Sequence, residues 1–184
     1  MEFYEVVRRR RSVRKYRNDP VPDEVIARCL EAARLAPSWR NGQPWHFVVV
    51  RDRQTIARLT RANYAAGLAN LWLNDVPVMI VACGEPRLSG KKVDQSMYLV
   101  DVAAALEHLV LAATAEGLGT CWVGAFSEEK VRAVLGIPDH IRVVAVTPLG
   151  YPADEIGLYD LLANVGKRQR PRRTLEEIVH YDTW

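Results

Sequence analysis

The chain has 184 residues, about half of them apolar and about a quarter charged, a composition typical of one soluble globular domain. No apolar run approaches the roughly 18 residues of a membrane span, and the N-terminus lacks the apolar core of a signal peptide, which argues against a membrane protein and against export. The net charge of +3 is too small to indicate a nucleic-acid binder without a closer look at where the charges lie.

The first half of the chain predicts three helices and one strand. Residues 2–10 are predicted to form a short helix, and residues 23–36 have the three-four apolar spacing of an amphipathic helix with Asp23 as its N-cap. The run "HFVVV" at 46–50 predicts a strand, and residues 54–74 predict a helix that could break near Gly67. The side chains expected to face inward from the first helix are Phe3, Val6 and Val7.

A strand and the longest helix follow. Every residue of "VPVMIVAC" at 76–83 is apolar, which predicts a strand buried on both faces. Residues 93–116 are predicted to form a helix whose centre is apolar nearly all round, so it should lie inside the protein. Gly117 is its expected C-cap, and His108 within it is expected to be a core histidine.

The remaining elements complete an α+β pattern. Residues 120–123 predict a short extended piece, and Ser127 is expected to cap a helix that ends near Leu135. Residues 141–150 predict another buried strand. Few strands separated by helices favour a modest sheet covered by helices.

The basic residues gather in two places. Residues 6–17, "VVRRRRSVRKYR", hold seven of the 25 basic residues and no carboxylate, and residues 167–173 hold five more, which leaves 13 against 22 acidic residues elsewhere. A general nucleic-acid binder spreads a basic face over its body, whereas two local clusters fit a local anion better. We therefore expect no nucleic-acid partner.

The opening run alternates basic residues with small or apolar ones. In an extended segment Arg10, Ser12 and Arg14 would share one face. Two guanidinium groups with a hydroxyl between them match a phosphate or an anionic ring edge, because arginine donates paired hydrogen bonds in a planar fork. The alternative is a solvated run of charge without a ligand.

A rigid polar segment, "APSWRNGQPWHF", spans residues 36–47. Two prolines stiffen it and Asn41–Gly42 supplies a turn, and rigid polar loops next to a buried strand often bind ligands. Trp39 and Trp45 could stack on a flat ligand, or Trp45 could belong to the core with Trp39 as a surface cover. The donors of the segment are Ser38, Arg40, Asn41 and Gln43.

The glycines of "EGLGTCWVGAF" at 116–126 do not form a dinucleotide fingerprint, because Trp122 occupies the third glycine position and the segment follows a helix. What remains is Gly124–Ala125, where small side chains let a ligand approach the backbone.

No nucleophile or metal motif occurs in the sequence: GxSxG, P-loop and HExxH are absent, and the four histidines lack metal spacing. Any chemistry is therefore expected to belong to a bound cofactor. The cysteines have no CxxC spacing and are expected to be free thiols that fill the core in a reducing compartment. They are Cys29, Cys83 and Cys121.

Five segments in this order resemble the FMN-dependent nitroreductase family along nearly the whole chain. They are "RRSVRKY" at 10–16, "APSWRNGQPWHFVVV" at 36–50, "EGLGTCWVGAF" at 116–126, "PLGYP" at 148–152 and "RRTLEEIVHYDTW" at 172–184.

The resemblance implies a nitroreductase-like α+β fold with a central, mostly antiparallel sheet flanked by helices. It implies that residues 1–184 form a single FMN-binding domain in an intertwined homodimer with two FMN at the interface. A C-terminal tail of about residues 166–184 would wrap around the partner subunit. The protein is expected in the cytoplasm.

The resemblance also implies roles for particular residues. Arg10, Arg11 and Ser12 would hold the FMN phosphate and ribitol, and Arg14 would meet the pyrimidine edge of the ring. Many family members have a glutamate where this chain has Gly124, so only a backbone contact near flavin N5 is implied there. The other implied contacts are Ala125 beside N5, Pro37, Ser38 and Asn41 from the second subunit, and Arg170 and Arg172 at the phosphate.

The implied activity is a ping-pong hydride transfer from NADH or NADPH through flavin N5 to a nitroaromatic, a quinone or a similar small acceptor. Alternatives on the same scaffold are a flavin reductase, a dehalogenase, a dehydrogenase or a flavin-fragmenting enzyme. A flavin-binding or nucleic-acid-binding module without turnover is the alternative from another class. The sequence names neither the physiological acceptor nor the preferred nicotinamide.

Overall fold

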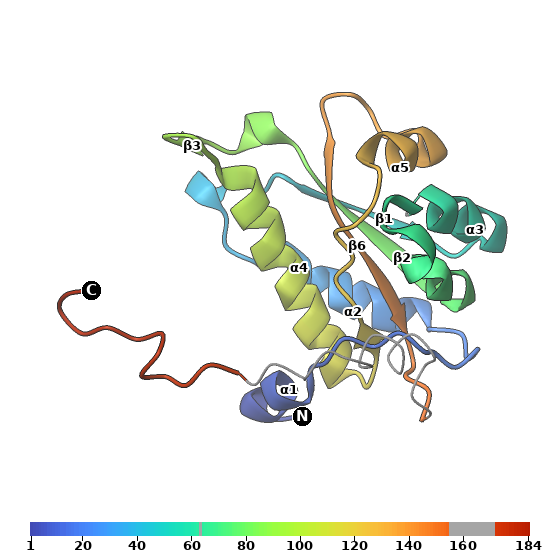
Figure 1. Cartoon of the computed structure of the whole chain (residues 1–184), viewed down its shortest axis with the longest axis horizontal. Coiled ribbons are helices and arrows are strands. Elements are labelled where there is room, and N and C mark those ends of the chain that lie inside the picture. Colours follow the sequence, from blue (N-terminus) through green and yellow to red (C-terminus); the bar gives the residue numbers. More distant parts are fainter. Residues whose placement is uncertain (63, 155–171) are drawn as a thin grey trace.

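The fold is built on one four-stranded antiparallel sheet. The computed structural model describes residues 1–62, 64–154 and 172–184. The strands lie in the order β1-β2-β6-β5, and every neighbouring pair is antiparallel, with helices on both faces (Figure 1). The predicted α+β architecture is thereby confirmed. The strand bounds are β1 Trp45–Val50, β2 Val78–Gly84, β5 Gly119–Thr120 and β6 Arg142–Gly150.

The helices follow the predicted pattern with shifted ends. The stretch predicted as one helix at 54–74 is an α-helix followed by a 3-10 segment, and residues 91–96 form a small hairpin, β3 Lys91–Lys92 with β4 Gln95–Ser96, before the longest helix begins. The α-helices are α1 Phe3–Arg9, α2 Asp23–Arg34, α3 Arg53–Ala62, α4 Met97–Ala115 and α5 Glu128–Leu135. The 3-10 segments are η1 Trp39–Asn41, η2 Tyr64–Asp75 and η3 Pro86–Leu88.

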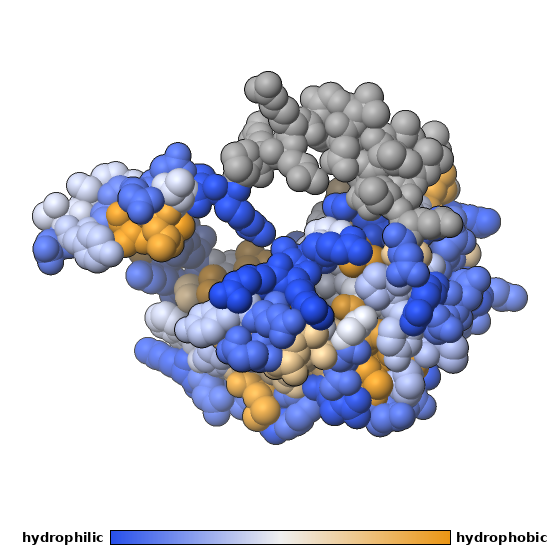
Figure 2. Space-filling model, turned by 90° about the horizontal axis from the view of Figure 1, so that it is seen from below, coloured by the Kyte–Doolittle hydropathy of each residue, from blue (hydrophilic) through white to orange (hydrophobic). Residues whose placement is uncertain are grey.

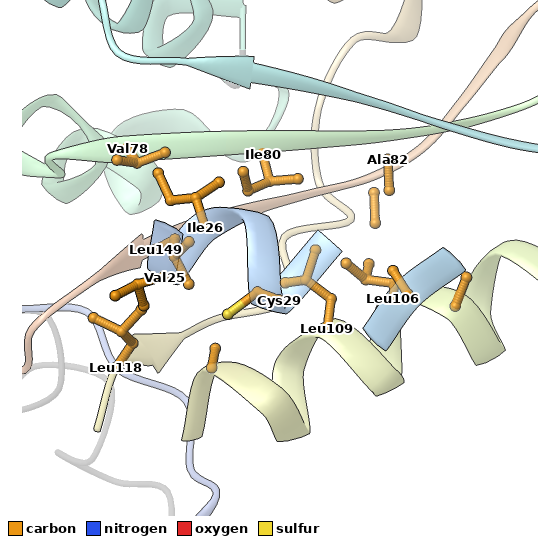
Figure 3. Close-up of a cluster of buried hydrophobic side chains, with 14 of the residues drawn as sticks. Val25, Ile26, Cys29, Val78, Ile80, Ala82, Leu106, Leu109, Leu118 and Leu149 are labelled. Atoms are coloured by element: carbon orange, nitrogen blue, oxygen red, sulfur yellow. The ribbon is translucent and has the colours of Figure 1, made fainter. Parts of the chain in front are cut away.

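The core has two layers because β2 buries both of its faces. Val78, Ile80 and Ala82 pack on one side against α2 and α4, with Leu106 and Leu109 from the latter helix (Figure 3). The side chains that alternate with them pack on the other side, against α3 and α5. Alternate side chains of a strand point to opposite faces of the sheet, so the all-apolar strand β2 contributes to two separate hydrophobic layers. This is what its apolar sequence predicted.

Although no uninterrupted apolar run reaches the length of a membrane span, helix α4 with its two carboxylates is long and apolar enough on average to cross a membrane by length and composition alone. In the structure it lies across one face of the sheet, and eight of its residues are buried. One of these is Asp101, whose carboxylate receives two hydrogen bonds from protein groups. Helix α4 thus packs as a core helix, which is the position that the sequence predicted for it.

One of the predicted end signals is correct, since Ser127 accepts the Lys130 N–H at the start of α5. The C-cap of α4 is Glu116, and Gly117, predicted as the cap, is the next residue, with φ +78°. Asp23 is the first residue of α2 and not its N-cap, which is Pro22. On α1 only Val6 is buried, so the predicted inward positions of Phe3 and Val7 are wrong.

The three cysteines are free and buried, as predicted. Burial raises the pKa of the Cys29 thiol to about 11 and that of the Cys83 thiol to about 12. Both groups therefore stay protonated near neutral pH and serve as apolar packing, not as nucleophiles.

Glu128 fixes α5 to β6. Its carboxylate accepts two hydrogen bonds from the Arg142 guanidinium, at 2.7 and 2.8 Å, and one from the Val143 N–H at 3.0 Å. The hydrogen bonds from Arg142 lower the pKa of Glu128. This carboxylate holds a backbone amide of another element and lies outside the predicted site.

Candidate functional site

The basic opening run is extended and runs beside β5. The Val13 N–H donates to the Thr120 carbonyl oxygen at 2.8 Å, and the Tyr16 hydroxyl donates to the Val13 carbonyl oxygen at 2.5 Å. Gly119 has no Cβ, and a Cβ there would lie 2.7 Å from a methyl carbon of Val13. Segments far apart in the sequence are thus joined, and glycine permits their close approach.

Burial along this run follows the predicted alternation only around Val13. Val13 is buried in the core layer beneath the segment, whereas Ser12 is exposed and Arg14 is half-buried. Arg10 is half-buried and Arg11 is exposed. The burial of Val13 leaves its neighbours Ser12 and Arg14 on the outer side, whereas the burial of Tyr16 and the exposure of Arg11 break the alternation.

Some arginines of the opening run form ion pairs with carboxylates and others do not. Arg9 pairs with Glu5 at 3.1 Å, and Arg17 pairs with Asp19 at 2.8 Å. Within the described ranges no carboxylate pairs with Arg10 or Arg11. Arg10 and Arg11 therefore keep their donors for another anion, while the flanking arginines are neutralised locally.

Gly124 and Ala125 follow β5 and are exposed. Val123 just before them exchanges two backbone hydrogen bonds with Val146, and the Asn70 side-chain amide donates to the Ala125 carbonyl oxygen at 3.2 Å. A Cβ at Gly124 would meet no atom within 4 Å. Packing in the described chain does not require glycine there, and its backbone is open to a flat ligand.

The loop that carries Pro37, Ser38 and Asn41 lies elsewhere. The Trp39 N–H donates to a carboxylate oxygen of Asp101 at 2.8 Å, near the start of α4, whereas Thr120 follows the end of that helix. The stretch of α4 from Asp101 to its end is about 21 Å long. Figure 1 shows the loop at one end of α4 and the opening run at the other.

Both tryptophans of this loop contact the protein. The ring of Trp39 lies against Gly90, where a Cβ would come within 2.7 Å of Nε1, and the Arg40 guanidinium lies 6.0 Å from the Trp39 ring centroid. Trp45 packs against the α2–α4 core layer. The structure therefore favours Trp39 as a surface cover and Trp45 as part of the core, over the alternative in which they stack on a flat ligand.

The C-terminal segment stands away from the rest of the described chain. Figure 2 shows residues 172–184 projecting to one side with a hydrophobic cluster on their surface. Arg172 is exposed, and Arg170 lies outside the described residues, as does most of the basic cluster. The large exposed side chains of this segment are Leu175, Ile178, Val179, Tyr181 and Trp184.

Sequence reasoning missed three residues that hold these loops: Asp101, Thr120 and Asn70. Asp101 carried a usable signal, since a carboxylate in a helix that is apolar nearly all round needs a partner where it is buried. Thr120 acts through its carbonyl, and Asn70 through a contact with Ala125 that local pattern does not reveal. In the part of the chain that the structure describes, no group of three or more His, Cys, Asp or Glu side chains could hold a metal ion.

The profile of the Nitroreductase family matches residues 7–69 and 59–151. The chain belongs to the nitroreductase family. It is 40% identical to an Archaeoglobus fulgidus protein provisionally named NADH dehydrogenase/NAD(P)H nitroreductase, over all of this chain and 99% of that one. A nitroreductase family protein from Clostridium novyi NT superposes with a TM-score of 0.80 at 41% identity, covering 84% of this chain and 87% of that one.

The family also includes a relative that is named for different chemistry. The chain is 34% identical to the 5,6-dimethylbenzimidazole synthase of Rhodospirillum rubrum, over 88% of this chain and 87% of that protein. Family membership therefore supports the nitroreductase fold and an oxidoreductase scaffold, and the particular reaction needs a separate argument.

Proposed function

We propose that the protein is an FMN-dependent oxidoreductase that takes a hydride from NADH or NADPH and passes it to a nitroaromatic, a quinone or a similar small acceptor. The names of its relatives support NAD(P)H as the donor. In this proposal residues 1–184 form one domain, and the protein works as a cytoplasmic homodimer with two flavins at its interface.

The residues beside β5 fit the two ends of FMN. Arg10 and Arg11 have no described carboxylate partner, and Ser12 is exposed beside them, so this set suits a dianionic phosphate. Further along the same stretch, Gly124 and Ala125 present open backbone without a side chain that would block a flat ring. The candidate phosphate-binding residues and the open backbone of Gly124 and Ala125 thus both lie next to β5.

Each residue has a defined task in this proposal. Arg10, Arg11 and Ser12 donate hydrogen bonds to the phosphate and ribitol, with Arg170 and Arg172 closing over the phosphate. Arg14 donates to the pyrimidine edge of the ring, where its positive charge favours the extra negative charge of the reduced state. FMN, when bound, supplies the hydride chemistry at its N5, beside the backbone of Gly124 and Ala125.

The observation that carries the proposal is the separation of the predicted site residues within one chain. The opening run and the loop with Pro37, Ser38 and Asn41 lie at opposite ends of α4. One flavin that contacts both would require the loop of a second subunit. The projecting segment 172–184, with its exposed apolar side chains, suits a wrap around that subunit.

A different reaction on the same scaffold is the second candidate, and the similarity to a 5,6-dimethylbenzimidazole synthase favours it over a module without turnover. The two candidate functions share the flavin site and differ in the molecule that reacts at the flavin ring. The acceptor therefore distinguishes them, and flavin binding does not.

The test is reductive titration of the purified protein without oxygen. We expect a yellow protein that releases FMN and not FAD on heating, is bleached by NADH or NADPH, and regains its colour with a quinone or nitroaromatic. A yellow protein that a nicotinamide bleaches, but whose colour neither a quinone nor a nitroaromatic restores, would support the second candidate. A colourless protein that does not take up FMN would overturn the proposal.

A further inference from the structure

Asp101 is a buried carboxylate that holds two loops. Its side chain lies in the second turn of α4 and is only 4% exposed. One oxygen accepts the Trp39 N–H at 2.8 Å, and the other accepts the Ser89 hydroxyl at 2.6 Å. A carboxylate is stable at such a position only when strong donors replace water, and here the donors come from two segments far apart in sequence.

These two loops pack against each other without space between them. A Cβ at Gly42 would lie 2.0 Å from the Leu88 carbonyl oxygen, and one at Gly90 would lie 2.7 Å from the Trp39 indole nitrogen. The Gly90 carbonyl oxygen in turn accepts the Met97 N–H at the start of α4, at 3.0 Å. Residues 38–43 and 85–90 therefore form one packed unit on the end of α4, with Asp101 beneath it.

The backbone of the first loop is strained. Arg40, Asn41 and Gln43 all have positive φ, at 51°, 57° and 45°, although none is glycine. Within the loop, the Ser38 hydroxyl oxygen accepts the Gln43 N–H at 3.0 Å. Left-handed conformations at non-glycine residues persist only where surrounding contacts hold them, and Asp101 supplies one such contact from outside the loop.

We propose that Asp101 is a positioning residue for the flavin ring bound by the partner subunit. By fixing the Trp39 amide it holds Ser38 and Asn41 in the shape that meets the ring. The inference rests on the proposed function, since it assumes that the loop reaches a flavin at the interface. It adds that one carboxylate of the core, which touches no ligand itself, sets the contact at the ring end of the cofactor.

The decisive measurement is the affinity of Asp101→Ala for FMN and for riboflavin. We expect both affinities to fall by about the same factor, tenfold or more, because both ligands carry the same ring and only FMN has the phosphate. Asp101→Asn keeps an oxygen for the Trp39 N–H and should recover most of the affinity. Ser89→Ala removes one hydrogen bond and should lower both affinities less than Asp101→Ala does.

Glu128→Ala is the matched control. Glu128 is also a carboxylate that accepts a backbone N–H from another element, but it holds Val143 and not the loop. It should lower the melting temperature and leave the riboflavin affinity unchanged. Arg10→Ala is the opposite control, because loss of a phosphate contact should weaken FMN binding and not riboflavin binding.

Mixed dimers test whether the loop acts across the interface. When an Asp101→Ala subunit and an Arg10→Ala subunit carrying different tags are produced together, random pairing makes half the dimers mixed. Each mixed dimer then has one intact site, so about a quarter of all sites should bind FMN at wild-type affinity. If the loop served the flavin of its own subunit, every site would be damaged and no such class would appear.

The outcomes separate the inference from the proposed function. Wild-type protein that binds neither flavin would overturn both. Wild-type protein that binds FMN, together with an Asp101→Ala variant that folds and binds riboflavin normally, would overturn only the role of Asp101. If Asp101→Ala does not fold, Ser89→Ala decides by the same comparison of FMN with riboflavin.

Discussion

Residues 10–17 and residues 172–184 lie near opposite ends of the chain and are held in different ways. The Val13 N–H joins the first segment to β5, and the Arg17 N–H joins it to Tyr151, just after β6, while its apolar residue Val13 is buried. The second is exposed throughout, and it projects to one side of the described body with its large apolar side chains exposed (Figure 2).

This difference shows where each segment obtains its conformation. The opening run takes its shape from its own chain, since hydrogen bonds and core packing hold it in place. The C-terminal segment has exposed apolar surface that a second chain could cover, as protein–protein contact sites do. Changes in the first segment should therefore alter folding, and changes in the second should alter assembly.

The largest expected effect is that of removing residues 175–184 while Arg172 and Arg173 remain. The deletion takes away all five large apolar side chains, each of which contributes about 1.5–3 kcal/mol when fully buried. We expect a shift from dimer to monomer in analytical ultracentrifugation, with loss of FMN. A truncated protein that remains dimeric and yellow would assign the interface to other surfaces.

The next effect concerns two glycines near the opening run. Gly119→Ala should destabilise the protein by about 1–3 kcal/mol, because the new methyl group would overlap the Val13 side chain. Gly124→Ala is the control and should leave stability almost unchanged, since its Cβ meets nothing. Urea denaturation of both variants measures the difference, and equal destabilisation would contradict the close approach of Val13 to Gly119.

The two basic clusters should converge on one phosphate. Arg10→Ala and Arg172→Ala should each weaken FMN binding about tenfold or more, because a hydrogen bond to a charged group is worth about 1.5–3 kcal/mol. The double variant should deviate from additivity, since both arginines would share a ligand. Fluorescence titration with FMN and with riboflavin measures this, and riboflavin binding should not change.

Arg8→Ala is the control for these variants, because Arg8 is exposed on α1 and has no proposed role. An effect of Arg170→Ala in place of Arg172→Ala would shift the register of the tail and keep the two-cluster explanation. If no arginine of the tail affected FMN binding, the basic charge there would need a different partner.

The smallest expected effect is that of Tyr16→Phe. It removes the hydrogen bond from the Tyr16 hydroxyl to the Val13 carbonyl oxygen and should cost about 1 kcal/mol of stability. Tyr4→Phe is the control, since Tyr4 is exposed and should tolerate the change. Chemical denaturation distinguishes them, and an unchanged Tyr16→Phe variant would mean that this bond does not hold the segment.

Most elements were predictable because their signals are local. The all-apolar run of β2, the three-four spacing of α2 and the capping serine at Ser127 each depend on a few neighbouring residues, and all three predictions are confirmed. Errors arose where tertiary contact overrides local pattern. Phe3 and Val7 have helical apolar spacing, yet both are exposed on α1 in the described chain.

The candidate site shows the same contrast between features set by local sequence and features set by tertiary contacts. Residue type and alternation alone predicted that Arg10, Ser12 and Arg14 share one face, because an extended segment places alternate side chains together, and the binding of an anion there stays a prediction. Only the folded structure revealed the hydrogen bond from the Val13 N–H to Thr120 and the one from the Trp39 N–H to Asp101. Each links residues distant along the chain, so it depends on how the helices and the sheet stack, which no local pattern of side chains encodes.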